Sequence, residues 1–481
     1  MEFYIDIKRR HAFIIALASS LLFGILLVNA FGGNNPSVVG HSALELIVNG
    51  SSVVDDSLTG ADIDESTLVI GGSSLDGAVI IVTPGNETTI QNAIDNLSSL
   101  GGGTVYMREG TYTVAGPINL TSNIALVGEG SATILQATTN GIDIVTEQSA
   151  TLLTNVQLRD FAIRPGAATG LDGVMFTDVT GLIEGLDISA IQGRSISVTR
   201  TTIPSPMTTA IRRNTIVSTG TDGILVSGGS DIPGANVIVS ENVVNGTVSD
   251  AIDCQGHADI RDNDVRGGIG IRGAAQCIIS GNYVSSTTGA GIDVSSAQVH
   301  VSNNVIILAQ TEGITCTCAG SIVGNSVRLW SQGAGTHAGI RATASGGATN
   351  PAVLIGNNWL EAFSGGGEGI NATGVVTITG NHVLPISGFF GIAINSNDVT
   401  ISGNVVEDGG IWTRGNSEYA VTGNVINGNF DLNATSGSSF AITGNFIQGD
   451  LDATSSSTCT LTGNVVAGTL FPGTCSSSNN V

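Results

Sequence analysis

The sequence predicts an all-β solenoid, in which short strands stack coil upon coil. Two observations predict it. One short phrase ending in Asn recurs about every 21 residues, and a second phrase alternates with it. A third observation excludes a helical repeat: no window within these repeats keeps an apolar period of 3.6, and Gly occurs throughout them.

The first phrase is an apolar residue, then Ser or Thr, then Gly-Asn, as in Val421–Asn424. Asn tolerates left-handed backbone at a turn. Its amide can also hydrogen-bond to the same Asn one coil further on, as in other stacked sheets. We therefore interpret the series as a structural ladder. Its predicted members are Asn242, Asn263, Asn282, Asn304, Asn325, Asn357, Asn381, Asn404, Asn424, Asn445 and Asn464. On this register Trp359 falls at an inward position.

The second phrase is Gly-Ile-x-apolar, as in Gly223–Val226 and Gly291–Val294. Together the two phrases give each coil at least two short strands with alternating apolar and polar residues, separated by Gly, Asn and Ser turns. Such strands bury an apolar face only when coils stack into parallel sheets, about 4.8 Å apart.

One amphipathic helix is predicted at the entry to the solenoid, within residues 88–97, with Thr88 or Thr89 as its cap. Its apolar face consists of Ile90, Ala93, Ile94 and Leu97. Gly101–Gly103 ends it, and a strand begins at Thr104. The helix would cover the open end of the first coil.

This helix, the Gly turn, the strand Gly110–Tyr112 and the turn Gly128–Gly130 stand in an order that resembles the entry of pectate-lyase-like and tailspike β-helices. The resemblance covers roughly residues 86 to 470 and implies a right-handed parallel β-helix of the pectin-lyase-like superfamily. That fold carries lyases, hydrolases, isomerases, tailspikes and non-catalytic surface proteins, so it implies no single function.

The chain divides into four predicted regions: residues 1–33, 34–75, 76–140 and 141–481. The first is an export segment, because Lys8–Arg10 precede an uncharged apolar run at residues 12–30. It is either a cleaved signal peptide or a retained membrane anchor, and both place the rest of the chain at the cell surface or outside the cell. Residues 34–75 form a linker, residues 76–140 the cap and first coils, and residues 141–481 the main solenoid.

The linker phrase at residues 54–63 resembles the stalk repeats of phage tail fibres, which are often trimeric. A homotrimer is therefore one expectation, and a plain polar spacer is the other. The charge balance of 39 acidic against 16 basic residues, −23 in all, leaves no basic stripe for a nucleic acid. An acidic polymer would be repelled unless cations such as Ca²⁺ bridge it.

Four of the cysteines lead to structural predictions. Cys459 and Cys475 lie close to one coil apart, so a disulfide could join the last coils of an exported protein. Cys254 and Cys316 fall in an inward column and are interpreted as small core residues.

The outward position of the second phrase aligns Asp253, Arg272 and Asp293 on successive coils. One interpretation is an ion-pair ladder, in which Arg272 favours the ionised carboxylates. The other is catalytic: one Asp acts as acid or binds Ca²⁺, and Arg272 acts as base or neutralises a substrate carboxylate.

Parts of two polygalacturonase motifs are similar to Thr221–Ile224 and to Gly256-His257. No adjacent Asp pair follows the first of these stretches, and the closing Arg-x-Lys motif of that family is absent because the only Lys is Lys8. We therefore expect a non-catalytic structural or adhesive rod, without a cofactor, that can bind extracellular polysaccharide or an envelope surface. The alternative is an extracytoplasmic polysaccharide lyase or glycoside hydrolase, with Ca²⁺ if it is a lyase.

Overall fold

A computed structural model describes residues 78–481 except for short gaps. The gaps are residues 149–151, 202–206, 218, 229–234, 297, 331–336, 345–352, 363–366, 386–387, 397, 416–417, 435–437 and 455–457. All described residues belong to one compact unit. The export segment and the linker lie outside the described residues. Among those that are described, no helix is long and apolar enough to cross a membrane.

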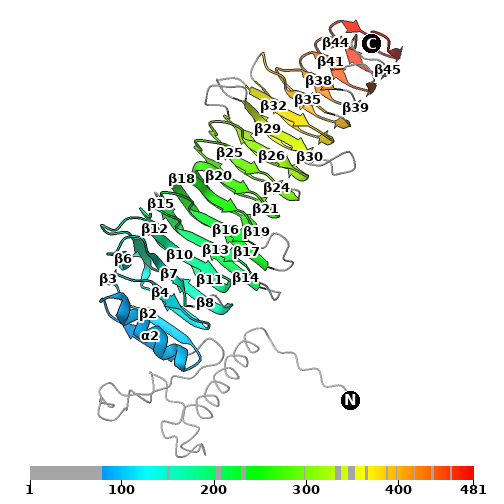
Figure 1. Cartoon of the computed structure of the whole chain (residues 1–481). Coiled ribbons are helices and arrows are strands. Elements are labelled where there is room, and N and C mark those ends of the chain that lie inside the picture. The colour runs from blue at the N-terminus through cyan, green and yellow to red at the C-terminus, as the bar shows by residue number, and fades with distance from the viewer. Residues whose placement is uncertain are drawn as a thin grey trace, which may run out of the picture. The chain divides into compact units, whose positions relative to one another are not determined.

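The helix at the entry is α2 (Glu87–Ser99), and it buries Ile90, Ala93, Ile94 and Leu97. Its cap is Asn86 rather than Thr88 or Thr89. The Asn86 side chain accepts a hydrogen bond from the backbone nitrogen of Thr89 at 3.2 Å. Figure 1 shows α2 beside β2, at the first coils of the solenoid. A single 3₁₀ turn, η2 (Gly130–Ala132), follows in the second coil.

The remaining elements form two parallel sheets, which confirms the predicted parallel β-helix. In the described residues, one sheet has 18 strands (sheet A) and the other has 30 (sheet B). Sheet A contains β1 (Ala78–Val82), β2 (Gly103–Met107), β5 (Ile124–Val127), β8 (Leu153–Arg159), β11 (Val179–Glu184), β14 (Met207–Arg212), β17 (Ala235–Ser240), β19 (Ala258–Arg261), β21 (Cys277–Ser280), β24 (Val299–Ser302), β27 (Gly320–Val323), β30 (Val353–Gly356), β33 (Val376–Thr379), β36 (Val399–Ser402), β39 (Glu418–Thr422), β42 (Ser439–Thr443), β45 (Thr458–Thr462) and β48 (Ser476–Ser478).

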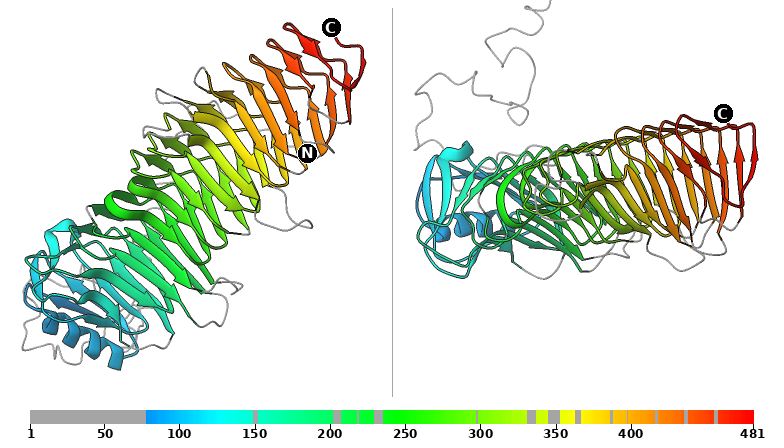
Figure 2. Two further views of the ribbon diagram at one scale, coloured as in Figure 1. Left: turned by 45° about the horizontal axis from the view of Figure 1, so that its top comes forward. Right: turned by 90° about the horizontal axis from the view of Figure 1, so that it is seen from above.

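Most coils add two strands to sheet B, one after the Asn turn and one carrying the second phrase (Figure 2). Sheet B contains β3 (Gly110–Val114), β4 (Ile118–Leu120), β6 (Thr133–Ala137), β7 (Asp143–Glu147), β9 (Ala162–Arg164), β10 (Asp172–Thr177), β12 (Asp187–Ser189), β13 (Ile196–Arg200), β15 (Thr215–Val217), β16 (Ile224–Gly228), β18 (Val243–Cys254), β20 (Asp264–Gly273), β22 (Tyr283–Ser285), β23 (Ile292–Val294), β25 (Val305–Ile307), β26 (Ile314–Cys318), β28 (Ser326–Arg328), β29 (His337–Ala344), β31 (Trp359–Glu361), β32 (Gly367–Thr373), β34 (His382–Leu384), β35 (Ile392–Asn395), β37 (Val405–Val406), β38 (Ile411–Gly415), β40 (Val425–Ile426), β41 (Phe430–Ala434), β43 (Phe446–Ile447), β44 (Leu451–Asp452), β46 (Val465–Val466) and β47 (Leu470–Phe471).

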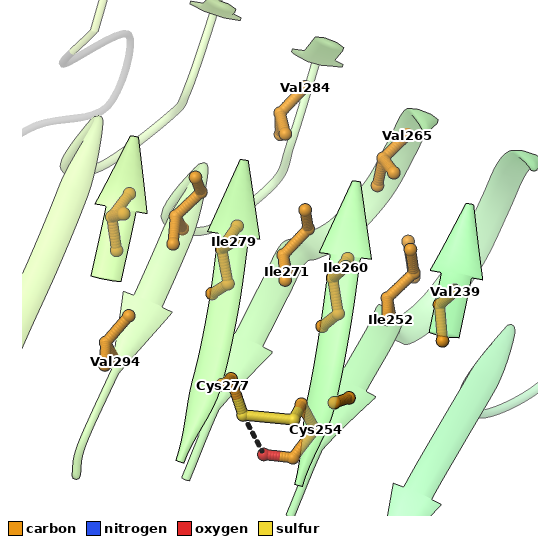
Figure 3. Packing of buried hydrophobic residues seen from close by; sticks show 14 of the residues in the cluster. Val239, Ile252, Cys254, Ile260, Val265, Ile271, Cys277, Ile279, Val284 and Val294 are labelled. Carbon is orange, nitrogen blue, oxygen red and sulfur yellow. Dashed lines mark hydrogen bonds between the residues drawn. A yellow bond between two sulfur atoms is a disulfide. The ribbon is translucent and has the colours of Figure 1, made fainter. Parts of the chain in front are cut away.

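The core is a stack of apolar residues contributed one coil at a time. Ile252, Ile271 and Ile292 align on successive strands and are fully buried. Figure 3 shows Ile252 and Ile271 within the core. Close packing requires the Gly before Ile271 and before Ile292. A Cβ at Gly291 would collide with the Ile306 side chain and with the carbonyl oxygen of Gly313. The phrase thus encodes both the inward residue and the close approach of the next coil.

An unbroken Asn ladder runs along the turn between the two sheets. In each step the side-chain Nδ2 donates to Oδ1 of the next Asn at 2.9–3.0 Å, from Asn214 through to Asn480. These bonds satisfy amides that are buried at every rung from Asn214 to Asn464.

One predicted rung is wrong. Asn358, not Asn357, bonds to Asn325 and Asn381, at 3.0 and 2.9 Å. Asn357 takes the left-handed position, with φ 53°, that Gly403 and its equivalents occupy in other coils. The shift of one residue reverses the sides of the following strand. Trp359 is therefore 39% exposed instead of inward.

Three disulfides occur: Cys254–Cys277, Cys316–Cys318 and Cys459–Cys475. Cys254 and Cys316 are buried, but they are not free core residues as we interpreted them. Cys459–Cys475 joins β45 to the segment before β48, across the last coil, with Cα atoms 4.5 Å apart.

Candidate acidic site on sheet B

The aligned row on sheet B lies where the repeat places it. Asp253 of β18 pairs in register with Arg272 of β20, and Arg272 pairs with Asp293 of β23. Asp253 is nevertheless only 2% exposed, and Leu225, its neighbour on β16, is 5% exposed. Surrounding side chains therefore cover this part of the outward row.

Two further acids join Asp253. Carboxylate oxygens of Asp222, Asp250 and Asp253 all lie within 4.8 Å of one another. Asp222 and Asp250 each stand two residues before the Ile of the second phrase, and those Ile residues are aligned on adjacent coils. Neither acid belongs to the outward row that the sequence predicts. The shared offset from the aligned Ile residues was the signal that could have placed them together.

The close ion pair of Arg272 differs from the expected ladder. In the described residues, Arg272 Nη1 lies 3.0 Å from Asp250 Oδ2, and the close pair is with neither Asp253 nor Asp293. Asp222 has its own cation, with Oδ2 3.7 Å from Arg194 Nε. The acids therefore outnumber the cations that face them, which are Arg272 and Arg194.

Burial controls the proton affinity of the cluster. Burial raises the pKa of Asp250 to about 6, although Arg272 opposes the shift. Burial also raises the pKa of Asp253 and of Asp293, against the hydrogen bond from Gln255 in the first case and against Arg272 in the second. Arg272 favours the ionised carboxylates, as expected, but desolvation outweighs this attraction and the net pKa shifts are upward.

One acceptor in the cluster has no partner in the part of the chain that the structure describes. Asp253 Oδ1 is buried and accepts no hydrogen bond, whereas Gln255 Nε2 donates to Asp253 Oδ2 at 2.6 Å. An unpaired buried carboxylate oxygen costs free energy, so this cluster is the strongest candidate site for proton or cation binding on sheet B.

The cluster also fits a hard cation by spacing. Ca²⁺ binds oxygen ligands at about 2.3–2.6 Å, so ligands on opposite sides of the ion stand up to about 5 Å apart. The three acids meet that limit. They would supply Asp253 Oδ1 and one oxygen each from Asp222 and Asp250, while Arg272 beside Asp250 would oppose the added positive charge.

Comparison with known proteins agrees with the fold. Residues 85–315 match the family model described as rhamnogalacturonase A/epimerase, pectate lyase-like. That part of the chain is similar to this family, which agrees with the resemblance stated from the sequence. No curated protein sequence matches this chain.

Three solved structures illustrate the range of similar proteins. The Azotobacter vinelandii mannuronan C-5 epimerase AlgE4 A-module is 16% identical, with 82% of this chain and 97% of that chain covered and a TM-score of 0.32. The Streptococcus pneumoniae surface protein and adhesin PfbA is 14% identical, with 74% and 95% covered and a TM-score of 0.36. The alginate lyase from Paenibacillus sp. str. FPU-7 is 16% identical, with 62% and 98% covered and a TM-score of 0.38. We draw no functional argument from these similarities.

Proposed function

We propose that this protein is an exported, non-catalytic rod of the cell surface or extracellular space, and that it binds glycans. The observation that carries the proposal is the unbroken Asn ladder from Asn214 to Asn480, which fastens each coil to the next. Export is supported by the basic residues and apolar run at the start of the sequence.

The burial of the acidic site supports a role without catalysis. A general acid must reach within about 3 Å of the proton acceptor on its substrate. Asp250 and Asp253 are each 2% exposed, so the surroundings of these carboxylates in the described residues leave little room for a sugar. On this view the cluster is an internal polar contact between coils.

The test uses the full-length purified protein and a panel of acidic and neutral polysaccharides, with and without Ca²⁺. We expect binding to at least one polysaccharide, and no release of reducing ends or unsaturated sugars. Cleavage that disappears in Asp250→Asn, but persists in the half-buried control Asp264→Asn, would overturn the proposal.

The second candidate is a polysaccharide lyase or glycoside hydrolase, and the pKa of Asp250 near 6 favours it. A carboxyl group tuned toward neutral pH suits a general acid. In a hydrolase, Asp250 would protonate the leaving glycosidic oxygen while Asp222 or Asp253 attacks the anomeric carbon, because carboxylates this close suit a retaining mechanism. Water would then release the sugar from the covalent intermediate. Loss of Asp250 should lower such a rate by about 10²- to 10⁴-fold.

Two finer parts of the proposal concern regions outside the described residues. The linker of residues 34–75 would assemble the chain into a homotrimer. Light scattering of the full-length protein should then give three times the monomer mass, and a monomer mass would contradict the trimer.

N-terminal sequencing of the exported protein decides between a cleaved signal peptide and a retained anchor.

A further inference from the structure

A cavity of about 210 Å³ opens on the outer face of sheet A, across β19, β21 and β24. Its lining includes His257, Gln276, Gln298 and His300, together with Ala258 and Ile278. The strand register explains the arrangement. Ala258 pairs with Cys277 on the next coil, and Ile278 pairs with His300 on the coil after that. Three successive coils therefore build one site.

None of the described residues that line the cavity is an Asp, Glu, Lys or Arg. Each Gln amide offers both donors and an acceptor, and a neutral imidazole nitrogen offers either a donor or an acceptor. Ile278 is 48% exposed and supplies an apolar surface. A ligand that matches this lining carries several hydroxyl groups around an apolar face and no net charge.

The hydrogen bond of His300 to Ser321 orients the imidazole ring. His300 Nδ1 lies 2.9 Å from Ser321 Oγ, so one edge of the ring is fixed by the protein. The opposite edge carries Nε2, which can donate to or accept from a hydroxyl according to the tautomer. A pocket that positions such groups before binding loses less entropy when the ligand arrives.

A disulfide holds two of the three coils together beside the cavity. Cys277 lines the cavity and is bonded to Cys254, which stands three residues before His257 (Figure 3 shows this disulfide among the core residues). The cross-link fixes the coil carrying His257 against the coil carrying Gln276. The site is thus built on rigid elements, as a binding site requires.

We propose that this cavity binds one neutral sugar unit of a glycan. The volume is below the usual range of about 300–1,000 Å³ for drug-sized ligands, so a single ring fits better than a longer segment. The inference rests on the proposed glycan-binding function and gives that function a location and a ligand class. It does not involve the acids, because those carboxylates belong to strands and turns of sheet B.

The experiment measures binding to the full-length protein by saturation-transfer NMR and calorimetry. The probes are methyl glycosides of glucose, galactose, mannose and N-acetylglucosamine, with methyl glucuronide as the charged comparison. We expect at least one neutral glycoside to bind, and binding to fall at least 10-fold in the double variant Gln276→Ala/Gln298→Ala. The control Gln448→Ala, at an exposed Gln that follows β43, should leave binding unchanged.

Each other outcome overturns the proposal in a distinct way. Polysaccharide binding that survives in the double variant would reject the cavity while leaving the glycan-binding rod intact. No binding to any glycan would reject both. Preference for the glucuronide would reject the neutral class. Binding of Zn²⁺ that is lost in His257→Ala and in His300→Ala, without sugar binding, would make the cavity a metal site instead.

Discussion

Asn424 donates two hydrogen bonds to the same oxygen of Asn445. Its side-chain Nδ2 and its backbone nitrogen both lie 2.9 Å from Asn445 Oδ1. The same Nδ2 also donates to the carbonyl oxygen of Ile401, in the preceding coil, at 3.0 Å. One side chain therefore connects three coils, and no other neutral side chain of this length offers both an acceptor and two donors.

Replacing Asn424 by Asp should destabilise the protein. The carboxylate loses the donors to Asn445 and Ile401 and is buried among carbonyl oxygens. Each lost hydrogen bond costs about 1–3 kcal/mol when a partner stays buried. Thermal unfolding should show a clearly lower Tm. Asn427→Asp, the same change at an exposed position of the same coil, is the control and should leave the Tm nearly unchanged. Equal melting of the two variants would argue against the ladder.

Asp250 should make stability depend on pH. Its pKa is about 6 in the folded protein and 3.8 as the reference value, so the folded state holds the proton more tightly. Stability is then greatest below about pH 4 and falls as pH rises to about 6, by roughly 3 kcal/mol from this group. Asp250→Asn cannot titrate. The Tm of the wild type, relative to this variant, should fall between pH 4 and pH 6. Parallel profiles would contradict the shift.

Opening the Cys459–Cys475 disulfide should loosen the last coils. The two residues are 16 apart, and cross-links of this span contribute about 3 kcal/mol by restricting the unfolded chain. Hydrogen exchange in β45 and β48 should become faster in Cys459→Ala/Cys475→Ala. The Cys316–Cys318 pair spans only 2 residues, so removing it restores little chain entropy and should leave exchange in those two strands unchanged.

At the left-handed turn before each ladder Asn, replacing Gly by Ala should destabilise the protein more than replacing it by Asn. Gly423 has φ 64°, and a Cβ there would meet nothing within 4 Å, so only the backbone conformation opposes a side chain. Gly423→Ala should cost about 1 kcal/mol or more, while Gly423→Asn should cost less, because Asn tolerates the left-handed region. Asn303 and Asn357 already occupy equivalent turns at φ 56° and 53°. Equal losses in chemical denaturation would refute this explanation.

The repeat made the fold predictable, because one physical requirement recurs in every coil. The Asn phrase and the Gly-Ile phrase, repeated in successive coils, are enough to predict the strands, the sheets and most of the register. The ladder prediction was wrong where a neighbouring residue also fits the spacing of the repeat. Asn357 precedes a second Asn, and either one satisfies the pattern by spacing. Only the backbone shows that Asn357 takes the Gly position and Asn358 the rung.

The candidate site was less predictable, because it depends on burial and side-chain direction. The alignment gave the row containing Asp253 and Arg272, but it could not show that Arg272 would turn toward Asp250. Nor could it show that covering side chains would reduce the exposure of Asp253 to 2%. The Cys254–Cys277 bond was missed for a similar reason. An inward column predicts a buried Cys, and the partner lies in the following coil on the other sheet.

The strands run across the solenoid axis, so a force along that axis would load the inter-coil hydrogen bonds one row at a time. Such a rod yields by peeling from an end, and the resistance of its outermost coil sets the force at which peeling begins. Cys459–Cys475 lies in that outermost coil, where a covalent bond shields the coil from peeling. Reducing agents should therefore weaken the rod to tension, with little effect on coils that carry no disulfide, such as those joined by Asn381 and Asn404.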